Sequence, residues 1–380
     1  MNLEEVRGLI DSIDERLAGL IKQRMELSAQ VADYKKAHNM PVLAAGRERE
    51  IQAKMAELCG EELERYVRVL YSTMFDISRA YQTSRLGSDA PLNGQLMQAL
   101  EHTSEQFPRN AVVACQGIEG AYSQLACEKL FASANIAYFK DWSGVFSAVE
   151  QGMCRYGILP IENSSAGSVT AVYDLMKQHR FYVVRSVRLR VHHSLLALPG
   201  TRMEDVTEII SHEQAINQCG RFLEGLGNVK ITVCENTAMA AQMVAASGRK
   251  DVAALSSDNC AAIYGLTPLK RGVQDNDNNY TRFICIAKDL EIYPGASRIS
   301  LMLSTPHQPG ALYRIITKFA CLELNLTKLE SRPVPGTDFE FRFYFDLDGW
   351  VGDPAVRSLL CELAEGMDEF VFLGNYNEII

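Results

Sequence analysis

The chain opens on a helical pattern, with apolar residues three and four positions apart. Its members are Leu3, Val6, Ile10, Ile13, Leu17, Leu20, Leu27, Val31 and Tyr34. This spacing predicts one long helix with a heptad stripe. A second helix is predicted from about Arg47. A third is predicted from a stripe made of Leu63, Val67, Leu70, Met74, Ile77 and Tyr81. The first 86 or so residues therefore predict an all-helical domain.

A different pattern follows a break at residues 84–94, where Gly, Pro, Asn and Ser predict a linker. A short amphipathic piece, 96–107, continues that connection. Beyond it, short apolar runs alternate with helical segments. Strands are predicted at 111–117, 156–162, 180–189, 192–200, 206–212, 229–235, 251–257 and 281–288, and helices at 123–134, 143–152 and 215–227. This alternation predicts an α/β domain.

A second break, at residues 288–297, separates off the last part of the chain. Its pattern is a strand, a helix, two strands, a helix and a strand, at 298–306, 310–323, 327–334, 339–349, 354–366 and 370–376. A βαββαβ order predicts a ferredoxin-like unit.

Composition limits what these domains can do. The 380 residues carry a net charge of -9, with 47% hydrophobic and 22% charged residues, as in folded globular proteins. An acidic chain without basic clusters disfavours nucleic acid or anionic membranes as partners. The first residues lack the pattern of a signal peptide, and no apolar stretch of about 18 residues occurs. We therefore expect a cytoplasmic protein.

The ten cysteines are spread singly, and the seven histidines form no metal-binding motif. This favours reduced thiols over disulfides. We expect no metal and no cofactor.

One position interrupts the apolar stripe of the first helix. The register requires an apolar residue at position 24, where the sequence has Arg24. A guanidinium in a buried seam is costly unless an anion meets it. Lys35, about three turns later, shares its face, and Arg7 lies roughly 100° away from that face. Arg24 could bind an anion, or it could only fix coiled-coil register.

The helical block resembles the all-helical chorismate mutase family over nearly its full length. The matching residues, in the family's order and spacing, are Arg7, Arg24, Lys35, Arg47, Glu48, Ser78 and Gln82. The resemblance implies an intertwined dimer in which Arg7 serves the partner's pocket. The sequence departs from the family at Ala44, where an Asp is usual.

The resemblance also implies roles for these residues in the rearrangement of chorismate to prephenate, which needs positioning and charge stabilisation but no proton transfer. The three arginines would bind carboxylates, and Glu48 would accept from the ring hydroxyl. Lys35 and Gln82 would donate to the ether oxygen as the catalytic pair.

The middle block resembles prephenate dehydratase across about 110–290. Four motifs occur in the family's order, namely PIENS at 160–164, SHEQAINQC at 211–219, YGL at 264–266 and NYTRF at 279–283. Glu213 stands where Pro is usual, and Cys115-Gln116 where Gly-Pro is usual. The implied fold is two α/β lobes, similar to periplasmic binding proteins, with the site in the cleft.

The dehydratase resemblance implies a set of site residues. They are Glu162, Asn163, Ser164, His212, Thr281, Arg282 and Phe283. Thr281 is implied as the catalytic residue, because its hydroxyl can donate to the leaving hydroxyl. A Thr hydroxyl is a poor general acid alone, so a relay through Glu162 or His212 is expected.

The last block resembles the ACT domain that follows prephenate dehydratases, which implies feedback inhibition by phenylalanine. The implied binding residues are Gly310, Ala311, Leu312, Glu330, Ser331 and Arg332. Such domains bind an amino acid between paired copies, so a homodimer or homotetramer is expected.

Together the blocks resemble the bifunctional chorismate mutase/prephenate dehydratases. The expected domains are 1–88, a linker at 89–108, the dehydratase at 109–290 and the ACT domain at 298–380. Two alternatives stay open: a dehydratase whose N-terminal helices only dimerise, and a two-lobed binding protein without catalysis. A dehydrogenase is disfavoured, because no GxGxxG follows a strand.

Overall fold

The computed structural model describes residues 2–38, 40, 42–86, 90–334 and 341–380. The predicted domain boundary near residue 88 and residues 339–340 of a predicted strand lie outside these ranges. The chain divides into two compact units. One holds residues 1–102 and 298–372, and the other holds 103–297 and 373–380.

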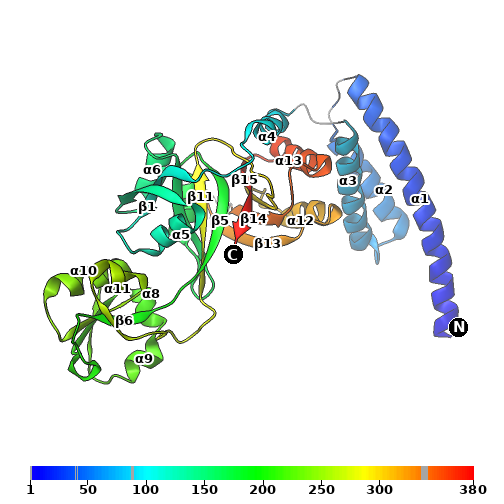
Figure 1. Ribbon diagram of the computed structural model, residues 1–380. Coiled ribbons are helices and arrows are strands. Elements are labelled where there is room, and N and C mark those ends of the chain that lie inside the picture. The colour runs from blue at the N-terminus through cyan, green and yellow to red at the C-terminus, as the bar shows by residue number, and fades with distance from the viewer. Residues whose placement is uncertain (1, 39, 41, 87–89, 335–340) are drawn as a thin grey trace. The chain divides into compact units, whose positions relative to one another are not determined.

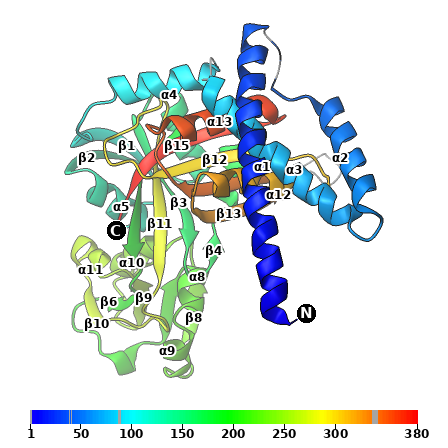
Figure 2. The same cartoon turned by 90° about the vertical axis from the view of Figure 1, so that its right-hand side faces the viewer.

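The first unit begins with the helices α1 (Leu3–Ala37), α2 (Ala45–Cys59), α3 (Glu64–Leu86) and α4 (Pro91–His102). Asn2 caps α1 in a capping box with Glu5. Figures 1 and 2 show α2 and α3 beside the C-terminal half of α1 only. The last helix, α4, falls within the predicted linker, where Pro91 suits a first helical turn.

The same unit contains the predicted βαββαβ order. Its elements are β12 (Arg298–Ser304), α12 (Ala311–Cys321), β13 (Leu326–Pro333), β14 (Phe341–Asp348), α13 (Pro354–Gly366) and the start of β15 (Phe370–Ile379). The strand order is β13-β14-β12-β15, as in a ferredoxin-like sheet. Both α12 and α13 pack against α3.

The second unit consists of two lobes. The first contains β1 (Asn110–Gln116), α5 (Tyr122–Leu130), β2 (Ser133–Phe139), α6 (Trp142–Glu150), β3 (Tyr156–Asn163), β4 (Gly167–Ser168), α7 (Thr170–Met176), β5 (Tyr182–Arg190) and β11 (Tyr280–Ala287). Its strand order is β5-β11-β3-β1-β2, and the end of β15 pairs with β5. Apolar side chains from these strands and α5 form its core.

The second lobe is an insertion between β5 and β11. It contains β6 (Ser194–Ala197), the 3-10 turn Met203–Asp205, β7 (Glu208–Ser211), α8 (Glu213–Asn217), α9 (Gly220–Glu224), β8 (Lys230–Val233), α10 (Thr237–Ser247), β9 (Val252–Ser256), α11 (Asn259–Tyr264) and β10 (Thr267–Lys270). Its strand order is β10-β6-β9-β7-β8 (Figure 1). The predicted two-lobed α/β fold is confirmed.

Two predicted helices differ from the structure. The helix predicted at 123–134 ends at Leu130, because 133–139 pairs with β1 as a parallel strand. The helix predicted at 215–227 is two short helices. Its break has a clear cause: the backbone carbonyl of Gln218 accepts from Asp275 N at 2.8 Å, and the Asp275 carboxylate accepts from Arg221 N at 3.2 Å.

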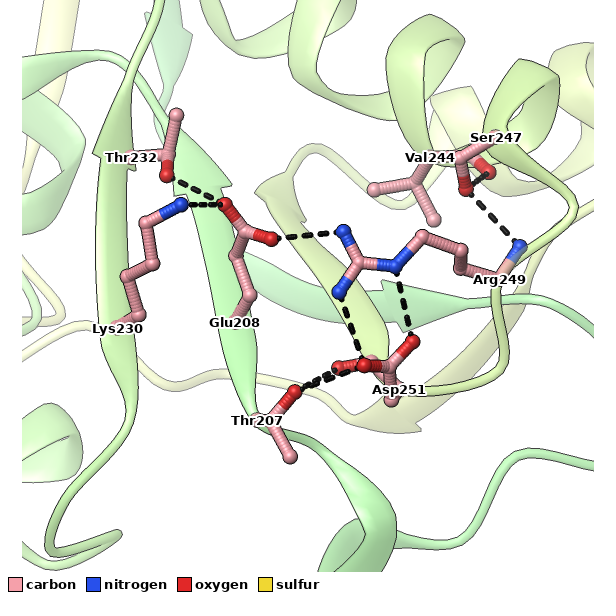
Figure 3. Close-up of polar contacts among 8 residues, drawn as sticks. All are labelled: Thr207, Glu208, Lys230, Thr232, Val244, Ser247, Arg249 and Asp251. Atoms are coloured by element: carbon pink, nitrogen blue, oxygen red, sulfur yellow. Dashed lines mark hydrogen bonds and ion pairs between the residues drawn. The ribbon is translucent and has the colours of Figure 1, made fainter.

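A cluster of ion pairs lies in the second lobe, at the N-terminal ends of β7 and β8 (Figure 3). Glu208 accepts from Lys230 Nζ at 2.8 Å, Thr232 Oγ1 at 2.6 Å and Arg249 Nη1 at 2.9 Å. Arg249 also binds Asp251. The hydrogen bond from Lys230, with those from Thr232 and Arg249, lowers the pKa of Glu208 to about 2. This end of the strands is opposite the end at which α8 begins, so we assign the cluster to stability.

Acid should therefore destabilise this lobe. The folded-state pKa of Glu208 lies below its ordinary value of 4.5, so its contribution is complete above about pH 4.5 and is lost as pH falls toward 2. Urea unfolding between pH 7 and 3 should show this loss. Glu208→Gln should flatten the dependence on pH, and an unchanged slope would contradict the assignment.

Candidate active sites

The first candidate site lies between α1 and α3, which run side by side in the same direction. The Arg24 guanidinium lies 5.7 Å from the centre of the Phe75 ring. One turn further along both helices, Ser28 Oγ lies 2.8 Å from Ser78 Oγ. Gln82 Nε2 donates to Ser78 Oγ at 3.3 Å. The predicted polar residues of both helices thus face one another.

This polar cluster is buried but incompletely paired. The exposed fractions of Lys35, Ser78 and Gln82 are 9%, 5% and 7%. Arg24 Nη1 and Gln82 Oε1 are buried and have no hydrogen-bond partner among the described residues. Lys35 Nζ donates to the Val42 carbonyl, and burial lowers the pKa of Lys35. Since unpaired buried polar groups are costly, the cluster suits a polar anionic ligand that would pair with them.

The two charged residues predicted from α2 differ in their surroundings. Glu48 forms an ion pair with Arg79, which also binds the buried Asp76. Arg47 lies outside the cluster, with 71% of its side chain exposed, and pairs with Glu50 at 3.2 Å. Within one chain, Glu48 lies at the cluster and Arg47 faces solvent.

Arg7 is far from the cluster on its own chain. It precedes Arg24 by 17 residues of an uninterrupted helix, about 26 Å at roughly 1.5 Å per residue. Apolar residues along the first half of α1 are exposed, for example Leu3 at 65%, Ile10 at 50% and Leu20 at 60%. Arg7 therefore does not reach the polar cluster of its own chain.

Ala44 occupies the N-cap position of α2 and makes no side-chain capping bond. An Asp at an N-cap would accept from a backbone N–H of the first turn, a contact typically worth about 1 kcal/mol. The departure from the family therefore removes a helix cap beside Glu48.

The second candidate site is a cavity of about 510 Å³ in the two-lobed unit. Its lining residues are Ser165, Ala166, His212, Glu213, Gln214, Asn217, Gln218, Asp275, Asn276 and Asn279. They come from the turn after β3, from α8 and from the segment that returns to β11. His212 both lines the cavity and caps α8, where its Nδ1 accepts from Gln214 N at 3.2 Å.

Asn163 and Thr281 are not among the lining residues, but they meet beside Asn279, which is one of them. Asn163 Nδ2 donates to Thr281 Oγ1 at 2.8 Å and to Asn279 Oδ1 at 2.9 Å. β3 and β11 are antiparallel with Asn163 opposite Thr281, and cross-strand partners share a face. The pairing of the two strands thus brings two of the predicted residues together.

Other predicted residues of this site point elsewhere. Glu162 is the cross-strand partner of Arg282, so both lie on the face opposite Thr281. Arg282 is buried, 4.0 Å from Glu378. Phe283 packs in the core of the first lobe.

Ser164 is not among the lining residues and binds the segment that leads into β11. Its Oγ donates to the Asn278 carbonyl at 3.0 Å and accepts from Tyr280 N at 2.9 Å. The structure therefore gives no geometry for a relay from Thr281 through Glu162, whereas His212 faces the cavity.

The YGL motif and a glycine turn after β1 contact each other between the two lobes. Gly120 has φ +87°, and an added Cβ there would lie 2.8 Å from Cys260 Sγ. Tyr264 OH of the YGL motif donates to the Glu119 carbonyl at 2.6 Å. The glycine turn after β1 and the YGL motif thus form one contact between the lobes.

Sequence reasoning missed three residues that are linked to Thr281 by hydrogen bonds through Asn163, namely His193, Gln218 and Asn279. Asn279 Nδ2 and His193 Nε2 both lie 2.9 Å from Gln218 Oε1. A signal was present for two of them, because Gln218 falls in the QC of one motif and Asn279 is the first residue of NYTRF, two positions before Thr281.

The third candidate site is a cavity of about 360 Å³ in the βαββαβ unit. Its lining residues are Thr305, Pro306, His307, Gln308, Gly310, Ala311, Leu312, Tyr313, Phe341 and Phe343. The predicted Gly310, Ala311 and Leu312 thus line it. Glu330, Ser331 and Arg332 lie on the outermost strand, β13, where Ser331 is the cross-strand partner of Phe343.

Residues 2–38, 40, 42–86, 90–334 and 341–380 contain no cluster of three potential metal ligands. No helix in the same ranges is long and apolar enough to cross a membrane.

Two family models match separate parts of the chain. Residues 113–291 match the family model of prephenate dehydratase, and residues 6–83 match chorismate mutase type II. The bifunctional chorismate mutase/prephenate dehydratase of Escherichia coli is 30% identical over 98% of this chain and 95% of its own length.

Two other proteins match the chain less completely. A chloroplastic arogenate dehydratase/prephenate dehydratase of Arabidopsis thaliana is 34% identical over 78% of this chain and 81% of its own length. The crystal structure of an Arthrobacter aurescens prephenate dehydratase in complex with L-Phe is 28% identical, with a TM-score of 0.65 over 70% of this chain and 90% of that one.

Proposed function

This chain belongs to the family of bifunctional chorismate mutase/prephenate dehydratases, and on that premise we propose that it converts chorismate to prephenate and prephenate to phenylpyruvate, with phenylalanine as inhibitor. The observation that carries the proposal is that both family matches coincide with a site built from buried polar groups. One lies in the helices, at Arg24 and Lys35, and one lies beside Thr281.

At the helical site, chorismate would supply hydrogen-bond partners for the buried donors. Arg24 would bind a carboxylate through its buried Nη1. Lys35 and Gln82 would donate to the ether oxygen as negative charge develops there. Glu48, held by Arg79, would accept from the ring hydroxyl. No side chain has to exchange a proton, which fits a pericyclic rearrangement.

A second copy of the chain would complete this site. The exposed apolar half of α1 would pack against the partner and deliver Arg7 to the partner's pocket. Arg47, exposed in the single chain, would also turn to the substrate in that assembly. We propose a homodimer, or a homotetramer built from it, with the cytoplasm as compartment. The ten free thiols support a reducing compartment.

At the dehydratase site, the C–O bond to the ring hydroxyl and the bond to the ring carboxylate break together. The electron pair released with CO₂ completes the aromatic ring, and the departing hydroxide takes up one proton and leaves as water. Thr281 would donate its hydroxyl hydrogen bond to that oxygen. His212 would supply a further polar group on the cavity wall.

Two observations favour a reduced function for the helices. Ala44 leaves α2 uncapped, and Arg47 faces solvent. Feeding chorismate and prephenate separately to the purified protein and monitoring phenylpyruvate tests both activities. If phenylpyruvate formed from prephenate but not from chorismate, the helices would serve only in dimerisation.

The terminal cavity is the proposed phenylalanine site, and Gly310 offers a direct test. Its φ is +78°, it caps α12, and an added Cβ would enter open space. Gly310→Val should strain the turn and obstruct the cavity, so phenylalanine inhibition of dehydration should weaken at least about tenfold. Inhibition curves with prephenate as substrate measure this effect.

Gly60 provides the matched control. It has φ +79° and equally open surroundings, but it lies at the end of α2. Gly60→Val should retain wild-type inhibition by phenylalanine. Unchanged sensitivity of Gly310→Val would refute the placement of the site.

A further inference from the structure

A chain of hydrogen-bonded side chains runs behind Thr281 toward the second lobe. Asn163 Nδ2 lies 2.8 Å from Thr281 Oγ1 and 2.9 Å from Asn279 Oδ1. Asn279 Nδ2 lies 2.9 Å from Gln218 Oε1, and so does His193 Nε2. The chain joins β3, β11, α8 and the segment that enters the second lobe.

Two backbone amides fix the direction of the first link. Ser165 N and Ala166 N lie 3.0 Å and 2.9 Å from Asn163 Oδ1. A backbone N–H can only donate, so this atom of Asn163 must be the amide oxygen. Both hydrogens of Asn163 Nδ2 are then donated, one to Thr281 and one to Asn279.

The donor and acceptor of each later hydrogen bond then follow in turn. Asn279 accepts through Oδ1, so its Nδ2 donates to Gln218, whose contacting atom must be the oxygen. That oxygen receives a second hydrogen bond from His193, so His193 carries its proton on Nε2. His193 is 2% exposed, its Nδ1 has no hydrogen-bond partner among the described residues, and burial lowers its pKa. A neutral Nε2–H imidazole satisfies all these conditions.

Two groups of this hydrogen-bond chain keep a donor for a further partner. Thr281 Oγ1 already accepts from Asn163, so its own hydrogen remains for another acceptor. Gln218 Oε1 already accepts two hydrogen bonds, so its Nε2 is the free end of a residue that lines the cavity. The lining residues include Glu213 and Asp275 but neither Lys nor Arg, so a carboxylate there depends on neutral donors.

We propose that His193 and Asn279 are positioning residues of the dehydratase, which hold the Gln218 side-chain amide in the orientation in which its Nε2 can donate to a substrate carboxylate. The inference rests on the proposed dehydratase function. It assigns to His193 a role through Gln218, with no contact to substrate.

Substitutions at His193 separate this role from simple packing. His193→Gln keeps a side-chain N–H donor for Gln218, whereas His193→Met has similar length and no donor. With Met, the Gln218 amide can rotate, so KM for prephenate should rise about tenfold or more, the scale of one lost hydrogen bond to a charged group. His193→Gln should stay within about threefold of wild type.

Substitutions in the cavity test the donor itself. Gln218→Glu keeps the accepting oxygen but replaces Nε2 by a second oxygen, so KM for prephenate should rise by about 10–100-fold. Gln214 lines the same cavity but is not part of this series of hydrogen bonds. Gln214→Glu therefore adds the same charge to the cavity and measures the effect of charge alone. Equal effects of the two variants would overturn the proposal.

The readouts distinguish the possible failures. The melting temperature and the circular dichroism spectrum of each variant report whether its dehydratase unit is folded. Equal KM values for the Gln and Met variants of residue 193, both folded, would overturn the positioning role. If the wild-type protein formed no phenylpyruvate from prephenate, the proposed function would fail before this inference is reached.

Discussion

Replacing Thr281 with Val is expected to lower kcat for phenylpyruvate formation by about 10²–10³-fold, the usual cost of one transition-state hydrogen-bond donor. Val fills the same space as Thr, so the loss would come from the hydroxyl alone. Asn163 Nδ2 would then lose its acceptor at 2.8 Å, and some loss of stability should accompany the loss of rate. Steady-state kinetics with prephenate, together with thermal unfolding, separates the two effects.

Two controls belong to this experiment. Thr281→Ser retains the hydroxyl and should recover most of the rate. Chorismate turnover by Thr281→Val should equal that of wild type, because the helical site shares no residue with the dehydratase. A kcat within about threefold of wild type for the Val variant would remove Thr281 from the mechanism.

Removal of the buried guanidinium should abolish most of the mutase activity. Arg24→Met keeps the length and apolar contacts of the side chain but cannot bind a carboxylate. We expect kcat/KM for chorismate to fall by about 10²–10³-fold, in the range for loss of one partner of a buried charge pair. Chorismate consumption measures this, and dehydration of prephenate should be unaffected.

The same variant decides between the two interpretations of Arg24. Nη1 is buried without a partner in the free protein, so replacing it by an apolar group should leave stability unchanged or raise it. If Arg24 only fixed register, Arg24→Met would leave turnover intact and change the assembly instead. Sedimentation of both proteins shows which occurs.

The helical site could be predicted because its signal lies in a periodic pattern. A single cation in an apolar stripe stands out, and the partners one turn apart follow from helix geometry. The pairings of Arg24 with Phe75 and of Ser28 with Ser78 follow the same geometry. The solvent-facing position of Arg47 could not be predicted, because a single chain lacks the partner that the family would supply.

The dehydratase site was predictable only in part. Alternation along a strand puts Arg282 on the face opposite Thr281, and this could have been inferred from the TRF run itself. His193 could not, since a lone histidine after a strand carries no periodic or motif signal. Its importance arises from Gln218, a residue of another element, at 2.9 Å.

Short elements were also missed for a physical reason. β2 and β10 are held by pairing with β1 and β6 and contain Ala, Asn or Pro, which have little strand preference. The break between α8 and α9 depends on Asp275, far away in the sequence. Whether such elements form, and where they end, depends on tertiary contacts.

The end of β15 has a consequence for synthesis of the protein. Residues 373–380 belong to the dehydratase unit, where Asn377 pairs with Arg185 and Glu378 binds Arg188 at 2.7 Å. During synthesis, β5 cannot pair with the end of β15 until residues 298–372 have been translated. This takes about 4–15 s at roughly 5–20 residues per second. During that time the nascent chain exposes an unpaired strand edge, a site at which chaperones or neighbouring chains can bind.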